Sequence, residues 1–157
     1  MKLYIKQHVF TWGDQFSIFN ESGIEKYFVE GEIFTFGKKL HLMDRGGNEL
    51  AYIHQKLFSF LPKYSINING RDIAEVIKEL TFFNQEYHVT GLGWSVVGDF
   101  FAHEYEIRGG GRLLARIYKE WFTWGDAYAI DIDSTVDEIS VLAVVLVIDA
   151  VISDTHD

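Results

Sequence analysis

A five-residue segment that occurs twice is the feature that most constrains the fold of this chain. Phe10–Asp14 and Phe122–Asp126 share the sequence Phe-Thr-Trp-Gly-Asp, and Phe34–Gly37 repeats most of it as Phe-Thr-Phe-Gly. A weaker copy, Phe-Ser-Phe-Leu, occupies Phe58–Leu61. Five identical residues that include a tryptophan rarely coincide by chance in a chain of 157 residues. We therefore infer that the chain consists of copies of one supersecondary unit.

Extending the alignment gives six units that share one apolar position. The aligned segments are 9–18, 33–42, 57–66, 80–89 and 121–130, with a shortened copy at 100–107. The shared apolar residues are Phe16, Leu40, Tyr64, Tyr87, Tyr105 and Tyr128. Alternation of polar and apolar residues, as in Tyr64–Ile68, predicts a strand with one buried face, and Asn69-Gly70 predicts a tight hairpin turn. Each unit is thus predicted to be two antiparallel strands, which places about twelve strands in residues 1–133.

Such a row of hairpins can end in two ways. It has two exposed edge strands unless it closes on itself, and closure into a barrel removes both edges. An open meander or a two-sheet sandwich would show the same alternation along each strand. Periodicity alone therefore leaves closure open.

The C-terminal segment departs from the repeat. From Ile139 to Ile152, 12 of 14 residues are apolar, and Ser140 and Asp149 are the exceptions. The run is longer than an ordinary strand and shorter than the ~20 residues of a membrane-spanning helix. The sequence at 135–138, Thr-Val-Asp-Glu, resembles a capping box. We therefore predict a helix over about 135–153, although eight of the 14 residues are β-branched, which lowers helix propensity.

The helix and the strands can each bury the apolar surface that the other exposes. A helix that is apolar on every side must be buried on every side, and a barrel of about twelve strands is too wide for its own side chains to fill. We predict a mainly β, α+β fold: a closed antiparallel barrel around a central hydrophobic C-terminal helix. The alternative is a C-terminal membrane anchor, which the short length, Asp149 and the acidic tail at 154–157 oppose, so no membrane-spanning segment is expected.

The net charge, the cysteine content and the length of the chain restrict the function further. The formal net charge is −9, from 14 basic and 23 acidic side chains, so we expect no nucleic-acid partner. The absence of cysteine excludes disulfides, thiolate metal sites and thiol nucleophiles. Residues 1–8 lack the apolar core of a signal peptide, and a cytoplasmic location is expected. The length fits a single domain over residues 1–157.

Motifs that would indicate a catalytic, metal or phosphate site are weak in this sequence. Asp99, His103 and Glu104 cluster at the shortened turn, but no third anchored ligand accompanies them, and a solvated turn explains them better. The two Trp-Gly-Asp copies fit turn chemistry, because Gly permits positive φ and Asp bonds the local backbone. The segment 109–111 is glycine-rich but lacks the Gly-Lys-Ser/Thr of a phosphate loop. We expect no catalytic residue, no metal site and no cofactor.

Lysines give the one weak candidate for a ligand site. Lys38 and Lys39 lie at one turn, and Lys63 lies at the equivalent turn of the next unit. Stacked hairpins would bring these turns to one rim of the barrel, where lysines would attract an anionic headgroup. The alternative is ordinary solvated charge, which is common on protein surfaces.

The sequence resembles the LURP-one-related family. The resemblance covers essentially the whole chain and rests on the repeated aromatic hairpins, on the segment Leu50–Tyr64 and on the terminal segment Val141–Val151. It implies a fold similar to the tubby C-terminal domain, a twelve-stranded barrel around a central hydrophobic helix. Tubby domains bind phosphoinositides, and phospholipid scramblases look like distant relatives, but no lipid-site motif of that group aligns with residues of this chain.

Three functions follow as hypotheses. The first is a non-enzymatic module that binds phospholipid or phosphoinositide headgroups at the rim or outer wall, with Lys38, Lys39 and Lys63 as candidate ligand-binding residues. The second is a protein–protein interaction scaffold without a small-molecule ligand, which an exposed apolar patch would support. The third is an enzyme, which would need a polar pocket with convergent titratable groups.

Overall fold

The computed structural model describes residues 1–6, 15–32, 36–80, 85–122 and 125–155. It contains twelve strands followed by one helix, α1 (Glu138–Thr155). The strands are β1 (Lys2–Lys6), β2 (Gln15–Phe19), β3 (Glu25–Gly31), β4 (Lys39–Asp44), β5 (Glu49–Gln55), β6 (Lys63–Ile68), β7 (Arg71–Leu80), β8 (Gln85–Thr90), β9 (Trp94–Asp99), β10 (Glu104–Gly109), β11 (Arg112–Phe122) and β12 (Gly125–Ile132).

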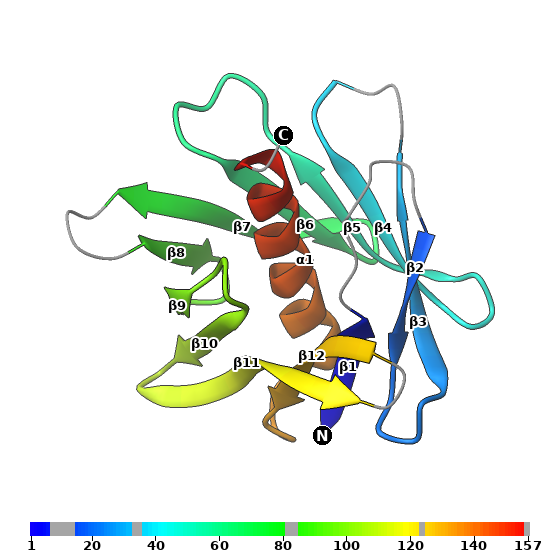
Figure 1. Cartoon of the computed structure of the whole chain (residues 1–157). Coiled ribbons are helices and arrows are strands. Elements are labelled where there is room, and N and C mark those ends of the chain that lie inside the picture. Colours follow the sequence, from blue (N-terminus) through cyan, green and yellow to red (C-terminus); the bar gives the residue numbers. More distant parts are fainter. Residues whose placement is uncertain (7–14, 33–35, 81–84, 123–124, 156–157) are drawn as a thin grey trace.

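The strands form a closed antiparallel barrel (Figure 1). Each strand pairs with the next one in sequence, and β1 closes the barrel by pairing with β12 from Lys2↔Asp131 to Lys6↔Ala127. The predicted closed barrel is therefore confirmed, and the meander and the sandwich are excluded. Closure leaves no edge strand whose backbone groups could pair with another chain.

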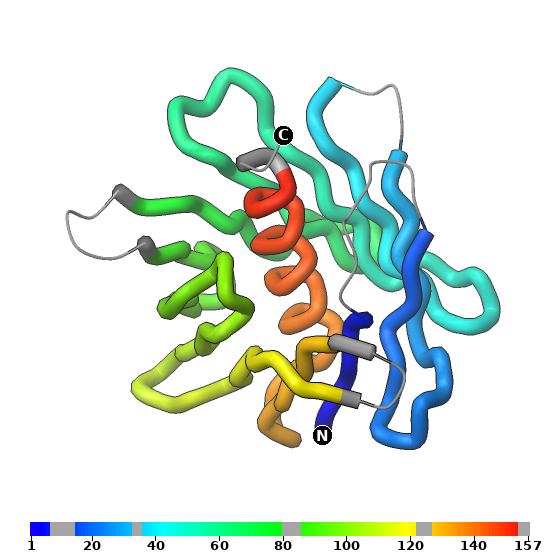
Figure 2. The backbone as a smooth tube through the Cα atoms, viewed as in Figure 1, coloured from blue at the N-terminus to red at the C-terminus, as the bar shows by residue number. Residues whose placement is uncertain are grey.

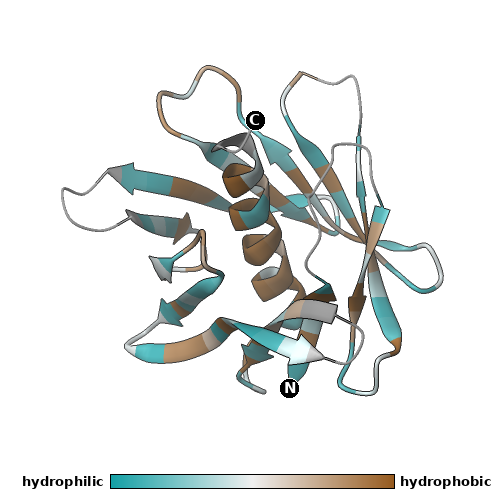
Figure 3. Ribbon diagram, in the orientation of Figure 1, coloured by the Kyte–Doolittle hydropathy of each residue, from teal (hydrophilic) through white to brown (hydrophobic). Residues whose placement is uncertain are grey.

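The helix fills the barrel, as predicted. Figure 3 shows an apolar helix enclosed by strands that alternate between polar and apolar residues. The helical residues from Val141 to Ile148 are all buried, and so are the six shared apolar positions of the repeat units. Burial on every side therefore outweighs the weak helix propensity of the β-branched residues. Within the described residues, no helix is both long enough and apolar enough to cross a membrane.

The start of the helix differs from the prediction. The helix begins at Glu138 rather than near residue 135, and Asp137 is its cap. The Asp137 carboxylate accepts hydrogen bonds from the Ser140 backbone N–H (3.2 Å) and from the Ser140 hydroxyl (2.5 Å). Thr135 instead donates from its backbone and its hydroxyl to Asp133. The predicted capping box centred on Thr135 is therefore wrong, because an aspartate two residues later offers the same acceptor.

The connections between strands are of two kinds, odd-to-even and even-to-odd, and the two kinds lie at opposite ends of the barrel. Because successive strands are antiparallel neighbours, every connection from an odd-numbered to an even-numbered strand lies at one end. The other end carries tight turns such as Asn69-Gly70, whose φ angles of 54° and 79° match the turn that Asn-Gly predicts. The predicted turns of the Phe-Thr-Trp-Gly units fall on 7–14, 33–35 and 123–124, which lie outside the described residues.

Candidate functional site

We call the end of the barrel that carries the odd-to-even connections the aromatic rim. Its described parts include the β3–β4 connection from Phe36 to Lys38, the β5–β6 connection from Lys56 to Pro62, and the end of β11. Figure 2 shows the first two connections rising on either side of the C-terminal end of α1. Exposed side chains of this rim come from three different hairpins.

Backbone hydrogen bonds hold the two connections next to each other. The Gln55 backbone N–H donates to the Lys38 carbonyl (2.8 Å), and the Lys38 N–H donates to the Gln55 side-chain oxygen (3.1 Å). The Lys56 N–H donates to the Lys63 carbonyl (2.8 Å), which closes the second connection. A Cβ built on Gly37 would lie 3.2 Å from the Leu57 side chain, so the two connections are in close contact.

The predicted lysines do lie at this rim, but two of them have partners inside the molecule. Lys38 donates from Nζ to the Ala150 carbonyl (2.8 Å) and to the Ser153 hydroxyl (2.9 Å), and it thereby caps the C-terminal end of α1. Lys63 forms an ion pair with Glu75 at 3.4 Å. For Lys39, whose side chain is half-buried, no partner of the ammonium group occurs in the described part of the chain.

Glu75 also pairs with Lys56, at the start of the same connection. Nζ of Lys56 lies 2.5 Å from Oε1 of Glu75, whereas Lys63 contacts Oε2. The hydrogen bond from Lys56 lowers the pKa of Glu75 below its ordinary value, with a further contribution from Lys63. The carboxylate therefore stays charged and holds two ammonium groups beside the β5–β6 connection.

Four large apolar side chains at this rim are almost fully exposed. The exposed fractions are 89% for Phe36, 103% for Phe58, 93% for Phe60 and 82% for Trp121, whereas no other large apolar side chain in the described ranges exceeds the 51% of Met1. Phe36 and Phe60 occupy the position of Trp12 and Trp124 in the repeat. Sequence reasoning missed these residues as site residues. The available signal was that the repeated aromatics lie in turns, where polar residues are normal.

A partly buried polar cluster lies beneath the rim. Asp149 of α1 accepts a hydrogen bond from the Tyr128 hydroxyl, and its other carboxylate oxygen lies 3.7 Å from Nε2 of His103. His103 also stacks on Tyr128 with ring centroids 4.5 Å apart. Burial raises the pKa of Tyr128 well above its ordinary value, and the charge of Asp149 raises it further. Tyr128 therefore remains a donor and stabilises the Asp149 carboxylate, which lies in the otherwise apolar stretch 141–152.

The structure does not assemble the predicted turn cluster of Asp99, His103 and Glu104. His103 points to Asp149 instead, and the Asp99 carboxylate accepts a hydrogen bond from the Ala102 backbone N–H at 3.1 Å. Asp99 thus has the turn role that the sequence favoured.

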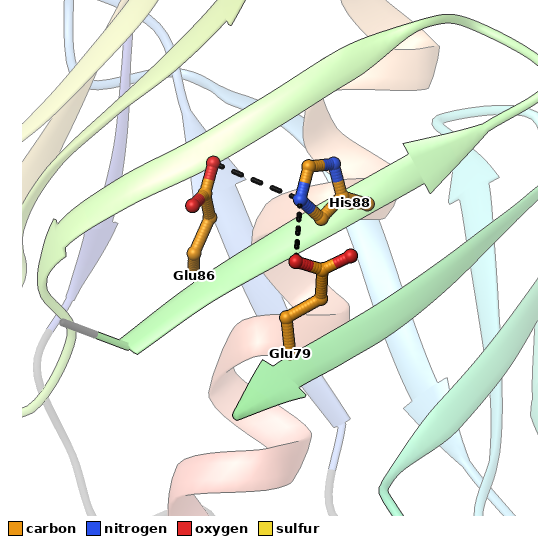
Figure 4. Close-up of side chains that lie close together, drawn as sticks. All are labelled: Glu79, Glu86 and His88. Atoms are coloured by element: carbon orange, nitrogen blue, oxygen red, sulfur yellow. Dashed lines mark ion pairs between the residues drawn. The ribbon is translucent and has the colours of Figure 1, made fainter. Parts of the chain in front are cut away.

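A third cluster lies on the outer wall, on the β7–β8 hairpin (Figure 4). Nε2 of His88 lies 3.0 Å from Glu79 and 3.8 Å from Glu86, and one ligand atom from each residue lies within 4.8 Å of the others. Glu79 and Glu86 are direct cross-strand partners, which explains their proximity. These groups are suitable ligands for a divalent metal, but solvent-exposed ion pairs account for the arrangement fully.

Comparison with known proteins gives matches that agree and that cover most or all of the chain. The sequence model of the LURP-one-related family matches residues 1–149. The "Uncharacterized protein YxjI" of Bacillus subtilis (strain 168) is 34% identical over 157 residues, covering 100% of this chain and 97% of that protein. An X-ray structure of a protein from Arabidopsis thaliana superposes with a TM-score of 0.68 at 14% identity, covering 96% of this chain and 90% of that one. The structural likeness supports the fold alone.

Proposed function

The chain belongs to the LURP-one-related family, and on this premise we propose that it is a non-enzymatic module that binds phospholipid or phosphoinositide headgroups at the aromatic rim. The observation that carries the proposal is the local charge of the rim. The segments 36–39 and 56–63 contain four lysines and no acidic residue, on a chain whose net charge is −9. A local basic surface attracts anionic groups even when the whole molecule is acidic.

The interior of the barrel is filled, which leaves the outer surface as the place where a ligand would bind. Helix α1 occupies it with buried side chains such as Val144 and Val145. Asp149, the polar side chain in the stretch from Val141 to Ile152, accepts a hydrogen bond from Tyr128 and is only 15% exposed. A ligand is therefore expected to meet the rim, where lysines are accessible.

The lysines differ in what they can offer a phosphate. Lys39 has no internal partner among the described residues, so its ammonium group can turn to a ligand without breaking a contact. Lys56 and Lys63 share one carboxylate, which leaves part of their charge uncompensated. Lys38 holds the helix end and thereby fixes the connection that carries Lys39. We therefore assign Lys39, Lys56 and Lys63 to headgroup binding and Lys38 to positioning.

Vesicle co-sedimentation tests this proposal. Phosphatidylcholine vesicles are compared with vesicles that also contain phosphatidylserine or a phosphoinositide, using the wild type and the double variant Lys39→Gln/Lys63→Gln. Each lysine near an anionic surface contributes about 1 kcal/mol, so the double variant should bind about 25-fold more weakly. The matched control, Arg45→Gln/Arg71→Gln, removes the same charge from exposed sites at the opposite end and should bind like the wild type. Equal recovery of the wild type with anionic and neutral vesicles would refute the proposal.

A protein-interaction scaffold is the second candidate, because the exposed aromatic side chains of the same rim favour it. The two candidates predict different salt and lipid dependence. A scaffold would sediment with no vesicle, and it would self-associate or capture a protein through Phe58 and Phe60.

A further inference from the structure

The aromatic residues of the rim are placed where they contribute little to the fold. Phe36, Phe58 and Phe60 are nearly fully exposed, so they gain little of the stabilisation that burial of an aromatic ring provides. Phe58 also has a φ of 64°, in the left-handed region that bulky residues rarely adopt. Neither packing nor backbone conformation explains a phenylalanine at this position. An apolar environment outside the molecule would give such a ring the burial that it lacks here.

The surroundings of these rings indicate the chemistry of that environment. Phe58 and Phe60 lie between Lys56 and Lys63 in the sequence, and Lys39 lies three residues after Phe36. Aromatic rings with flanking lysines are typical of segments that lie at a membrane surface, where the rings enter the headgroup–acyl boundary and the ammonium groups meet anionic headgroups. Indole rings such as that of Trp121 favour the same boundary.

The shape of the surface favours a bilayer over a folded protein partner. The exposed rings lie at the ends of three different hairpins, and their exposed fractions of 82% to 103% show that they stand clear of the side chains around them. A protein interface needs a closely packed core that excludes water, whereas a fluid lipid surface accommodates separate protruding rings. The closed barrel also presents these ends together, because all odd-to-even connections lie at one end.

We propose that Phe36, Phe58, Phe60 and Trp121 insert into the headgroup–acyl boundary of an anionic phospholipid bilayer and anchor the barrel by its aromatic rim. This inference rests on the proposed function, because the lysines would bring the rim to the surface before the rings enter it. It adds a component of binding that salt does not screen, since apolar burial is insensitive to the Debye length.

The first test measures that component. Co-sedimentation with phosphatidylcholine–phosphatidylserine vesicles is compared at about 0.1 M and about 0.5 M sodium chloride. The wild type should keep part of its binding at high salt, and the double variant Phe58→Ser/Phe60→Ser should lose that part, with a drop of about tenfold or more in the partition coefficient. Ile24→Ser, at the opposite end, is the matched control and should behave like the wild type. Thermal melting verifies that the substituted proteins remain folded, which their exposure leads us to expect.

The second test locates the insertion directly, and the absence of cysteine makes it clean. Ser59→Cys places one thiol between the two phenylalanines, and Ser22→Cys places one at the opposite end, both at exposed positions. An environment-sensitive dye is attached to the thiol. With anionic vesicles, its fluorescence emission should shift to the blue at residue 59 and not at residue 22.

The outcomes separate this inference from the proposed function. Binding that salt abolishes, without a dye shift at residue 59, would overturn insertion and leave headgroup binding intact. A lack of binding to any vesicle would overturn both proposals. Self-association that Phe58→Ser/Phe60→Ser abolishes, in a protein that binds no vesicle, would instead assign the rings to a protein contact and overturn insertion.

Discussion

Replacing Val145 by aspartate challenges the arrangement of helix and barrel most severely. Val145 is fully buried in the middle of α1, between Val144 and Leu146, which are also buried. Losing the burial of the valine side chain costs about 1.5–3 kcal/mol, and placing an ionised carboxylate there costs several kcal/mol more. Protonation limits that second cost but still requires about 1.4 kcal/mol for each unit by which the pKa rises. The total of about 5 kcal/mol or more is comparable with the whole stability of a typical domain, about 5–15 kcal/mol.

The native Asp149 shows what a carboxylate on this helix needs in order to be tolerated. It lies one turn beyond residue 145 on the same face of the helix, and the helix tolerates it because the Tyr128 hydroxyl donates to it. A carboxylate at residue 145 would lie one turn deeper in the barrel. We therefore expect Val145→Asp to be unfolded or insoluble, while Val145→Ala, which removes two methyl groups, should fold with about 2 kcal/mol less stability.

Circular dichroism during thermal and urea denaturation measures both effects. Val145→Ala should lower the melting temperature by about 4–8 °C. A soluble Val145→Asp protein with native circular dichroism and the melting temperature of the wild type would refute the burial of this helix in the barrel.

Two further changes test the polar contacts. Tyr128→Phe removes the donor to the partly buried Asp149 and should lower the free energy of unfolding by about 1–3 kcal/mol. The matched Tyr105→Phe should cost nothing, because the buried Tyr105 hydroxyl has no hydrogen-bond partner among the described residues. Equal losses of stability for the two variants in urea denaturation would contradict this. Partial burial opposes protonation of His41, but its hydrogen bonds to the carboxylates of Glu49 and Glu32 outweigh this effect and raise its pKa above 6.5. Its contribution to stability is therefore complete below that pH and is lost as the pH rises through the raised pKa, so His41→Gln should destabilise more at about pH 5.5 than at about pH 8. A loss independent of pH would show that the imidazolium plays no part.

The architecture was predictable because two independent patterns agree on it. Alternation in segments such as Tyr64–Ile68 predicts strands with one buried face, and the apolar run from Ile139 to Ile152 requires an apolar enclosure. Each observation leaves alternatives, but a barrel closed around a helix satisfies both at once. Closure by β1 and β12 follows from the need to remove edge strands rather than from any single residue.

The details of the site were less accessible to sequence reasoning. The lysine rim follows from the stacking of equivalent turns, but the contact of Lys38 with Ala150 joins positions 112 residues apart, and no local pattern encodes it. The same holds for Tyr128 and Asp149, which are 21 residues apart. The exposure of Phe58 and Phe60 was hidden because aromatic residues in a strand-rich chain are normally assigned to the core.

Hydrogen–deuterium exchange with and without anionic vesicles maps the surface that contacts lipid without any substitution. If the aromatic rim is the binding face, exchange should slow in peptides that cover residues 36–39 and 56–62 and stay unchanged at the opposite end, at residues 45–48 and 69–72. Unchanged exchange at the rim in a sample that binds the vesicles, or slowing confined to the opposite end, would contradict the account.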